Sequence, residues 1–112
     1  MKKILYLVIA CFLVGCAGTT APPAVGEGDA VQGKLIFDQQ CGLCHDALST
    51  NKKMGPGLKG LYQAPKLSTN GKPVTDANVL EKINTGGNGM SPYRDMLSDA
   101  EKANLIAYLK TI

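Results

Sequence analysis

The stretch that decides the fold is the pentapeptide Cys41-Gly42-Leu43-Cys44-His45, which has the pattern C-x-x-C-H. Thiols spaced in this way lie about one turn apart, so they can add to the two vinyl groups of one haem. The histidine that follows then places its imidazole under the iron. The pattern is the attachment signature of c-type haem, and it predicts one covalent haem c held by Cys41, Cys44 and His45.

Two other kinds of site use the same cysteine spacing. A thioredoxin-like redox pair would need a βαβ context, and the sequence around this motif does not suggest one. A structural zinc site needs four ligands, whereas this segment offers three. His45 is the single histidine of the chain, so a metal held by two imidazoles of the same chain is excluded.

The composition sets limits on the class of protein. The chain has 112 residues, 45% of them hydrophobic, and its 12 basic and 9 acidic side chains give a formal net charge of +3. These values favour one folded domain and argue against a disordered chain. They also give no indication of nucleic-acid binding. Four cysteines could form two disulfides. Because Cys41 and Cys44 are expected to bind the haem and Cys11 and Cys16 lie in the N-terminal segment, the predicted number of disulfides is zero.

The N-terminal residues have the pattern of an export signal. Two lysines precede the uninterrupted apolar run 4–14, which is too short to span a bilayer as a helix. The run ends in Leu13-Val14-Gly15-Cys16, which resembles the bacterial lipobox. We therefore expect residues 1–15 to be a lipoprotein signal peptide and Cys16 to carry the lipid. An ordinary secretory signal and a buried apolar helix are the other interpretations.

The next residues connect this signal to the folded part of the chain. Residues 16–28 are rich in small residues, proline and glycine, which is typical of a flexible linker. Residues 29–112 then form the predicted domain. This organisation predicts an exported protein that is lipid-anchored to a membrane and faces the periplasm or the cell exterior.

The domain is predicted to contain helices separated by long loops. Asp29 and Gln32 favour a helix over 30–40, and Thr75-Asp76 favours a second helix that stops at Gly86-Gly87. A capping box at Ser98 favours a third helix over 99–110. The expected buried faces are Val31, Leu35 and Ile36, then Val79, Leu80 and Ile83, then Leu105, Ile106 and Leu109 with Tyr108 beside them. No stretch alternates like a strand, so we expect an all-α fold whose core is completed by the haem.

From about Gly28 to Ile112 the sequence resembles a class I cytochrome c of the small bacterial monohaem type. The pattern Gly-Asp-Ala-x-x-Gly-Lys-x-x-Phe over 28–37, followed by C-x-x-C-H, is similar to the first helix of that family. The resemblance implies a cytochrome c-like fold in which three or more helices and long loops wrap around one haem. It also implies that the first and last helices cross at Gly33 and Phe37, with Tyr108 facing them.

The same resemblance implies roles for two loops. The segment 55–58, Gly-Pro-Gly-Leu, resembles the loop whose proline carbonyl accepts the Nδ1 proton of the haem histidine, which assigns that role to Pro56. The family presents a methionine thioether from a loop before the last helix, where this chain has Met90. Met96, Met54 and an open site without a sixth ligand are the alternatives. Met96 is otherwise expected in the core under the last helix, and Met54 on the histidine side. The family commonly has proline directly after this methionine, whereas here Ser91 intervenes.

With His45 and Met90 as axial ligands, the resemblance implies a single-electron carrier in a periplasmic or cell-surface respiratory chain. The expected partners are membrane oxidoreductase complexes or a terminal oxidase or reductase, and the expected state is monomeric. No catalytic constellation indicates an enzyme. A permanent haem subunit of a dehydrogenase or reductase, and a haem-based sensor, remain as alternatives. The chain also has a group of lysines that are either plain solvated surface or a basic side that steers an acidic partner. These are Lys52, Lys53, Lys59, Lys66, Lys72 and Lys82.

Overall fold

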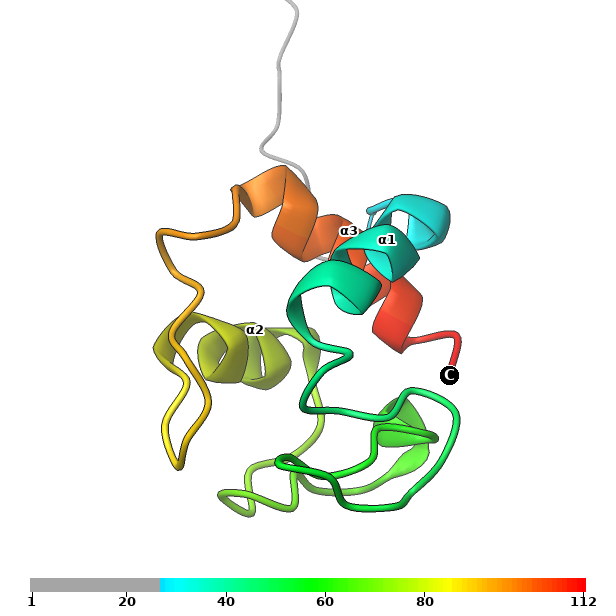
Figure 1. Cartoon of the computed structure of the whole chain (residues 1–112), viewed down its shortest axis with the longest axis vertical. Helices are drawn as coiled ribbons and strands as arrows, with labels where there is room; N and C mark the ends of the chain where they lie inside the picture. The colour runs from blue at the N-terminus through cyan, green and yellow to red at the C-terminus, as the bar shows by residue number, and fades with distance from the viewer. Residues whose placement is uncertain (1–26) are drawn as a thin grey trace, which may run out of the picture.

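The computed structural model describes residues 27–112 (Figure 1). Its elements are α1 (Ala30–Gln40), the short 3₁₀ helix η1 (Leu61–Gln63), α2 (Asp76–Thr85) and α3 (Asp99–Leu109). Residues 27–112 contain no β-strand, so the predicted all-α class is confirmed. The predictions for the signal peptide, for lipid on Cys16 and for most of the linker fall outside the described residues.

The helices begin where their caps were predicted. The side chains of Asp29 and Thr75 accept backbone N–H groups of the first turns of α1 and α2, at 2.8 and 3.2 Å. At α3 the capping box is complete, because Ser98 Oγ accepts from the N–H of Glu101 at 3.2 Å and the Glu101 carboxylate accepts from the N–H of Ser98 at 2.7 Å. α3 ends at Leu109, one residue earlier than predicted.

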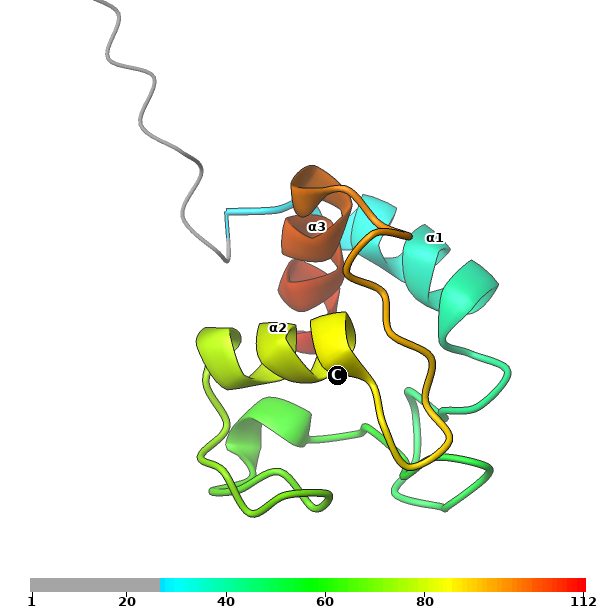
Figure 2. The same cartoon turned by 90° about the vertical axis from the view of Figure 1, so that its left-hand side faces the viewer.

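The fold is organised by the crossing of α1 and α3, which Figures 1 and 2 show packed together. A Cβ at Gly33 would lie only 1.9 Å from the carbonyl oxygen of Asn104, so the two backbones can approach this closely only at a glycine. Beside this contact the rings of Phe37 and Tyr108 pack with centroids 5.5 Å apart and planes inclined by 59°. The predicted crossing is therefore present.

The buried face of α1 differs from the predicted one at Val31 and Leu35, whereas Ile36 is partly buried against the core as expected. Val31 and Leu35 are 71% and 50% exposed, whereas Gly33 and Phe37 are buried. The two pairs are offset by two positions, or about 200° around a helix, so burying one pair exposes the other. The close backbone approach at Gly33 decides which face turns inward, and the hydrophobicity of the side chains does not.

α2 and the loops complete the body around α3. Val79 and Ile83 of α2 are buried, while Leu80 is partly buried, so the predicted inner face of this helix is confirmed. α2 contacts α3 directly. Figure 2 shows α2 lying beneath α3, with the yellow-to-orange loop of residues 86–97 linking the two helices. The long loops between α1 and α2 enclose the remaining side of the molecule (Figure 1).

Candidate haem-binding site

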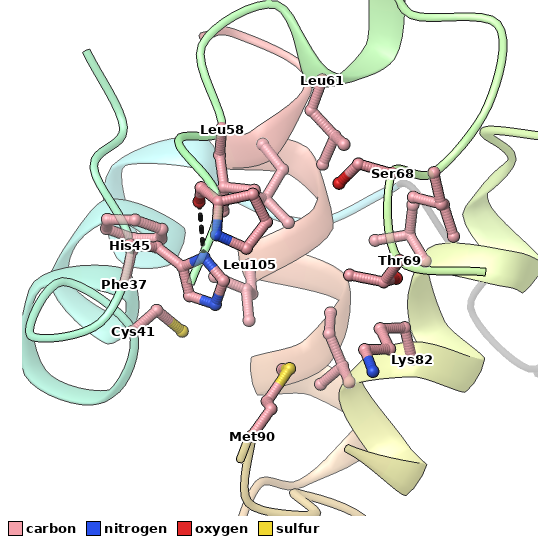
Figure 3. A pocket seen from close by; sticks show the side chains of 15 residues that line it. Phe37, Cys41, His45, Leu58, Leu61, Ser68, Thr69, Lys82, Met90 and Leu105 are labelled. Atoms are coloured by element: carbon pink, nitrogen blue, oxygen red, sulfur yellow. Dashed lines mark hydrogen bonds between the residues drawn. The ribbon is translucent and has the colours of Figure 1, made fainter. Parts of the chain in front are cut away.

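The Cys41–His45 motif continues the winding of α1 beyond its last residue. The N–H of Cys41 donates to the carbonyl of Phe37 at 2.8 Å, and the N–H of His45 donates to the carbonyl of Cys41 at 2.9 Å. This turn brings the Cys41 thiol and the His45 ring toward one cavity, as Figure 3 shows. Within residues 27–112, neither Cys41 nor Cys44 forms a disulfide, so both sulfur atoms are available for thioether bonds.

The orientation of the His45 ring is fixed by the loop that follows it. Nδ1 of His45 lies 2.8 Å from the carbonyl oxygen of Pro56, which can only accept, so Nδ1 carries the proton. The loop is held against the motif by a bond from the N–H of Gly55 to the carbonyl of Cys44 at 2.8 Å. The Nε2 atom therefore keeps a free lone pair, which is the form in which imidazole binds a metal.

Gly55 packs directly against the face of this ring. A Cβ at Gly55 would lie 2.4 Å from Cε1 of His45, closer than any ordinary contact. Only a residue without a side chain leaves room for the imidazole in this position. Sequence reasoning did not single out Gly55, although its place directly before Pro56 was visible.

The cavity itself has an almost entirely apolar lining. Its walls come from all three α-helices and from the loop after the motif, and the cavity opens partly to solvent. The apolar side chains are Phe37, Leu58, Leu61, Leu67, Val79, Ile83, Leu105 and Leu109. Ser68, Thr69 and Lys82 add polar groups (Figure 3). Such a surface suits a large flat apolar group with a few polar substituents.

Met90 enters the same cavity from the loop between α2 and α3. The residues before it, Gly86, Gly87, Asn88 and Gly89, all have positive φ, at 61°, 99°, 55° and 89°. Glycine tolerates this conformation without strain, so the run can form a tight turn closed by paired bonds between Gly87 and Met90 at 2.9 and 3.2 Å. The insertion of Ser91 does not move Met90 out of the cavity.

The other two methionines of residues 27–112 lie elsewhere. Met54 is 70% exposed and lies, as expected for the histidine side, in a second hollow that shares His45 and Met90 with the cavity and is here called its outer mouth. Met96 is 59% exposed and lines neither the cavity nor its mouth. The expectation that Met96 lies in the core is wrong, because Leu97 takes the inward position beneath α3 and is buried.

The two competing interpretations of the cysteine pair find no support in this geometry. Burial, with a smaller contribution from Cys44, raises the pKa of the Cys41 thiol to about 11. A thioredoxin-like cysteine needs the opposite shift. Within residues 27–112, no group of three or more His, Cys, Asp and Glu side chains is placed to hold a metal ion. A zinc site would need such a group.

The side chains do fit a haem. An imidazole with a free Nε2 and a soft thioether face one apolar cavity, and a thiol stands at its rim, as Figure 3 shows. Imidazole and thioether are a donor pair that haem iron takes in cytochromes. The apolar walls suit the apolar macrocycle of haem, and the polar side chains of Ser68, Thr69 and Lys82 suit its charged propionate groups.

Comparison with known proteins gives the family. The family profile described as "Cytochrome C oxidase, cbb3-type, subunit III" matches residues 28–109. A cytochrome c6-like protein of Nostoc sp. is 36% identical over 110 residues, which are 97% of this chain and 92% of the relative. A cytochrome c2 of Rhodopila globiformis is 29% identical over 108 residues, with 83% and 98% of the two chains covered.

A solved structure shares the fold as well. Cytochrome c6 from the diatom Phaeodactylum tricornutum superposes with a TM-score of 0.60 at 28% identity, over 75% of this chain and 93% of that one. Fold and site thus define a haem-carrying electron-transfer protein. The chain belongs to the cytochrome c family, as a small class I cytochrome c, and its cofactor is a covalently bound haem c. No helix within residues 27–112 is long and apolar enough to cross a membrane.

Proposed function

We propose that the chain is a single-electron carrier in which His45 and Met90 are the axial ligands of the haem iron and Cys41 and Cys44 form the thioether bonds. The observation that carries this proposal is the meeting of His45 and Met90 in one apolar cavity, from loops that are distant in the sequence (Figure 3). The Nδ1 bond of His45 to Pro56 supports it, because it leaves Nε2 free as a ligand.

The side chains around the cavity set the properties of the carrier. When bound, haem supplies an iron that cycles between the ferrous and ferric states. The Pro56 carbonyl keeps the imidazole in one tautomer and raises its basicity. The Met90 thioether is soft, so it favours ferrous iron and raises the reduction potential. His45 and Met90 would together hold the iron, which would leave no position for oxygen or peroxide and favours electron transfer over catalysis.

The outer mouth of the cavity is where a redox partner would approach. Lys52 and Lys82 both border this mouth, beside His45 and Met90. The other predicted basic residues, Lys53, Lys59, Lys66 and Lys72, do not border this mouth, and Lys72 is paired with Glu81 at 2.7 Å. We therefore narrow the predicted basic side to the mouth of the cavity, where positive charge would steer an acidic partner.

The proposal includes the location of the protein. The apolar run 4–14 and Cys16 support export, lipid attachment and a place in a periplasmic or cell-surface respiratory chain. Mass spectrometry of the mature protein tests this part. We expect a diacylglyceryl group on Cys16 as the first residue, and expect Cys16→Ser to release the protein from the membrane fraction. A mature chain that retains residues 1–15 would contradict this part.

An optical redox titration of the holoprotein, with and without carbon monoxide, tests the carrier function. We expect one one-electron transition whose midpoint and ferrous spectrum do not change with carbon monoxide, because Met90 occupies the sixth position. Rapid binding of carbon monoxide to the wild-type ferrous protein would instead favour the sensor alternative.

A second candidate is a permanent haem subunit of a larger oxidoreductase complex. The description of the matching family profile, which names a subunit of a cbb3-type oxidase, favours it. Purification from native membranes under mild conditions distinguishes the two functions. A free carrier elutes as a small monomer, whereas a subunit co-purifies with an enzyme at a fixed stoichiometry and over a large interface.

A further inference from the structure

We propose that Tyr93 is the positioning residue that keeps Met90 closed over the haem cavity, through a hydrogen bond from its hydroxyl group to the end of α1. The inference rests on the proposed ligation by Met90 and concerns how the chain secures that ligand. The residues considered are 86–97, here called the Met90 segment, which links α2 to α3 (Figure 2).

Two lysines secure the ends of the Met90 segment to the helices that border it. Nζ of Lys82 on α2 donates to the carbonyls of Gly86 and Gly87 at 2.8 and 3.3 Å. Nζ of Lys102 on α3 donates to the carbonyl of Arg94 at 2.7 Å. Lys102 is only 6% exposed, so this contact is well shielded. Both lysines therefore hold the segment to its neighbouring helices, α2 and α3, and neither connects it to α1.

The contact made by Tyr93 reaches the other side. Its hydroxyl donates to the carbonyl of Gln40 at 2.8 Å, across 53 positions of sequence. Gln40 is the last residue of α1 and directly precedes Cys41. This hydrogen bond therefore joins the Met90 segment to the end of α1, directly before the haem-attachment motif. For Met90 to move away from the cavity, the hydrogen bond between Tyr93 and Gln40 would have to stretch or break.

The backbone of Tyr93 gives its phenol a firm base. The N–H of Tyr93 donates to the carbonyl of Ile83 on α2 at 2.9 Å, and its carbonyl accepts from the N–H of Leu97 at 3.2 Å. Between this anchor and the contacts of Lys82 lies the glycine-rich turn that carries Met90. The turn itself is closed by the paired hydrogen bonds between Gly87 and Met90, and Met90 is its last residue. The Tyr93 bond, three residues after Met90, thus limits how far the thioether can swing out.

The test measures how fast an external ligand replaces Met90. Imidazole is mixed with the ferric holoprotein at concentrations where the rate no longer depends on imidazole, so that the departure of Met90 limits it. We expect Tyr93→Phe to react about threefold to fivefold faster than wild type, since one partly exposed hydrogen bond is lost. The absorption band of the methionine–iron bond is retained, because loss of the hydroxyl group alone leaves the resting ligation unchanged.

Two variants control for a general loss of stability. Tyr108→Phe removes a hydroxyl group from another aromatic residue, at the α1–α3 crossing. Ile106→Val weakens the core at a fully buried position outside the cavity lining. Both are expected to react at the wild-type rate. If Ile106→Val accelerates the reaction as much as Tyr93→Phe does, the effect reports overall stability and the role of Tyr93 is refuted.

Met90→Ala separates this proposal from the one on which it rests. If Met90→Ala removes the slow step but Tyr93→Phe reacts like wild type, the ligation stands and the role of Tyr93 is refuted. If Met90→Ala reacts no faster than wild type, Met90 is not the ligand and both proposals fail.

Discussion

Replacing Gly55 by alanine is expected to displace the His45 imidazole and to destabilise the haem site. A Cβ at position 55 would lie 2.4 Å from Cε1, 2.7 Å from Nδ1 and 2.9 Å from Nε2 of His45. Carbon atoms in contact keep a separation of about 3.5 Å, so the ring or the loop must move by about 1 Å. Neither the ring nor the loop moves freely. Nδ1 of His45 is hydrogen-bonded to the carbonyl of Pro56, and the N–H of Gly55 is hydrogen-bonded to the carbonyl of Cys44, both at 2.8 Å.

The expected cost follows from this geometry. Overpacking costs about 1–3 kcal/mol, and a weakened bond to Pro56 adds about 1 kcal/mol. In a domain of this size 1 kcal/mol lowers Tm by about 4–8 °C, so the Gly55→Ala holoprotein should melt about 8 °C or more below wild type. The assay is thermal unfolding followed by haem absorbance. The reduction potential should also rise, because a less basic imidazole stabilises ferric iron less.

The matched control is Gly42→Ala, within the haem-attachment motif. A Cβ there meets its nearest atom, the carbonyl oxygen of Asp38, at 3.4 Å, which is an ordinary contact. We expect its Tm to stay within about 4 °C of wild type. If Gly55→Ala and Gly42→Ala share the same Tm and potential, the reasoning on the packing of His45 is wrong.

Three further predictions concern other parts of the molecule. Gly33→Ala places a Cβ 1.9 Å from the carbonyl oxygen of Asn104 and should lower the free energy of unfolding in urea by about 3 kcal/mol; unchanged stability would contradict the crossing. Hydrogen bonds from Ser98 lower the pKa of Glu101, so its stabilising effect is complete above the unfolded pKa of about 4.3 and is lost as pH falls through the lower folded pKa. Glu101→Gln should therefore flatten the dependence of Tm on pH below about 5. If Tm falls with pH equally in the variant and in wild type, the role of Glu101 is contradicted. Lys52→Glu should slow electron transfer to an acidic partner at low ionic strength and converge with wild type at high salt; equal rates at low salt would reject steering at this mouth.

The features that the sequence predicted well are local ones. The caps at Asp29, Thr75 and Ser98 work through backbone groups two or three residues away, so short patterns are enough to locate the helix starts. The inner face of α3 follows from its spacing in the same way, and Ile106 is fully buried as expected. The resemblance to class I cytochromes c added the crossing at Gly33, which no local pattern determines.

The features that were missed depend on contacts between distant residues. The packing of Gly55 on the imidazole, the hydroxyl bond of Tyr93 to Gln40 and the burial of Lys102 all require the tertiary fold. The error on Val31 has the same origin, because a glycine contact with α3 outweighs the local apolar pattern in orienting α1. Hydrophobic spacing cannot reveal a helix face selected by the absence of a side chain.

The central claim is that Met90 completes the coordination of the iron, and a pair of methionine variants tests it most directly. Met90→Ala removes the thioether inside the cavity, whereas Met96→Ala removes one that is 59% exposed. The ferrous form of each holoprotein is titrated with carbon monoxide, and its reduction potential is measured. We predict that Met90→Ala binds carbon monoxide readily and has a lowered potential, while Met96→Ala behaves like wild type. A Met90→Ala protein that keeps the low-spin spectrum and the potential of wild type would contradict the account.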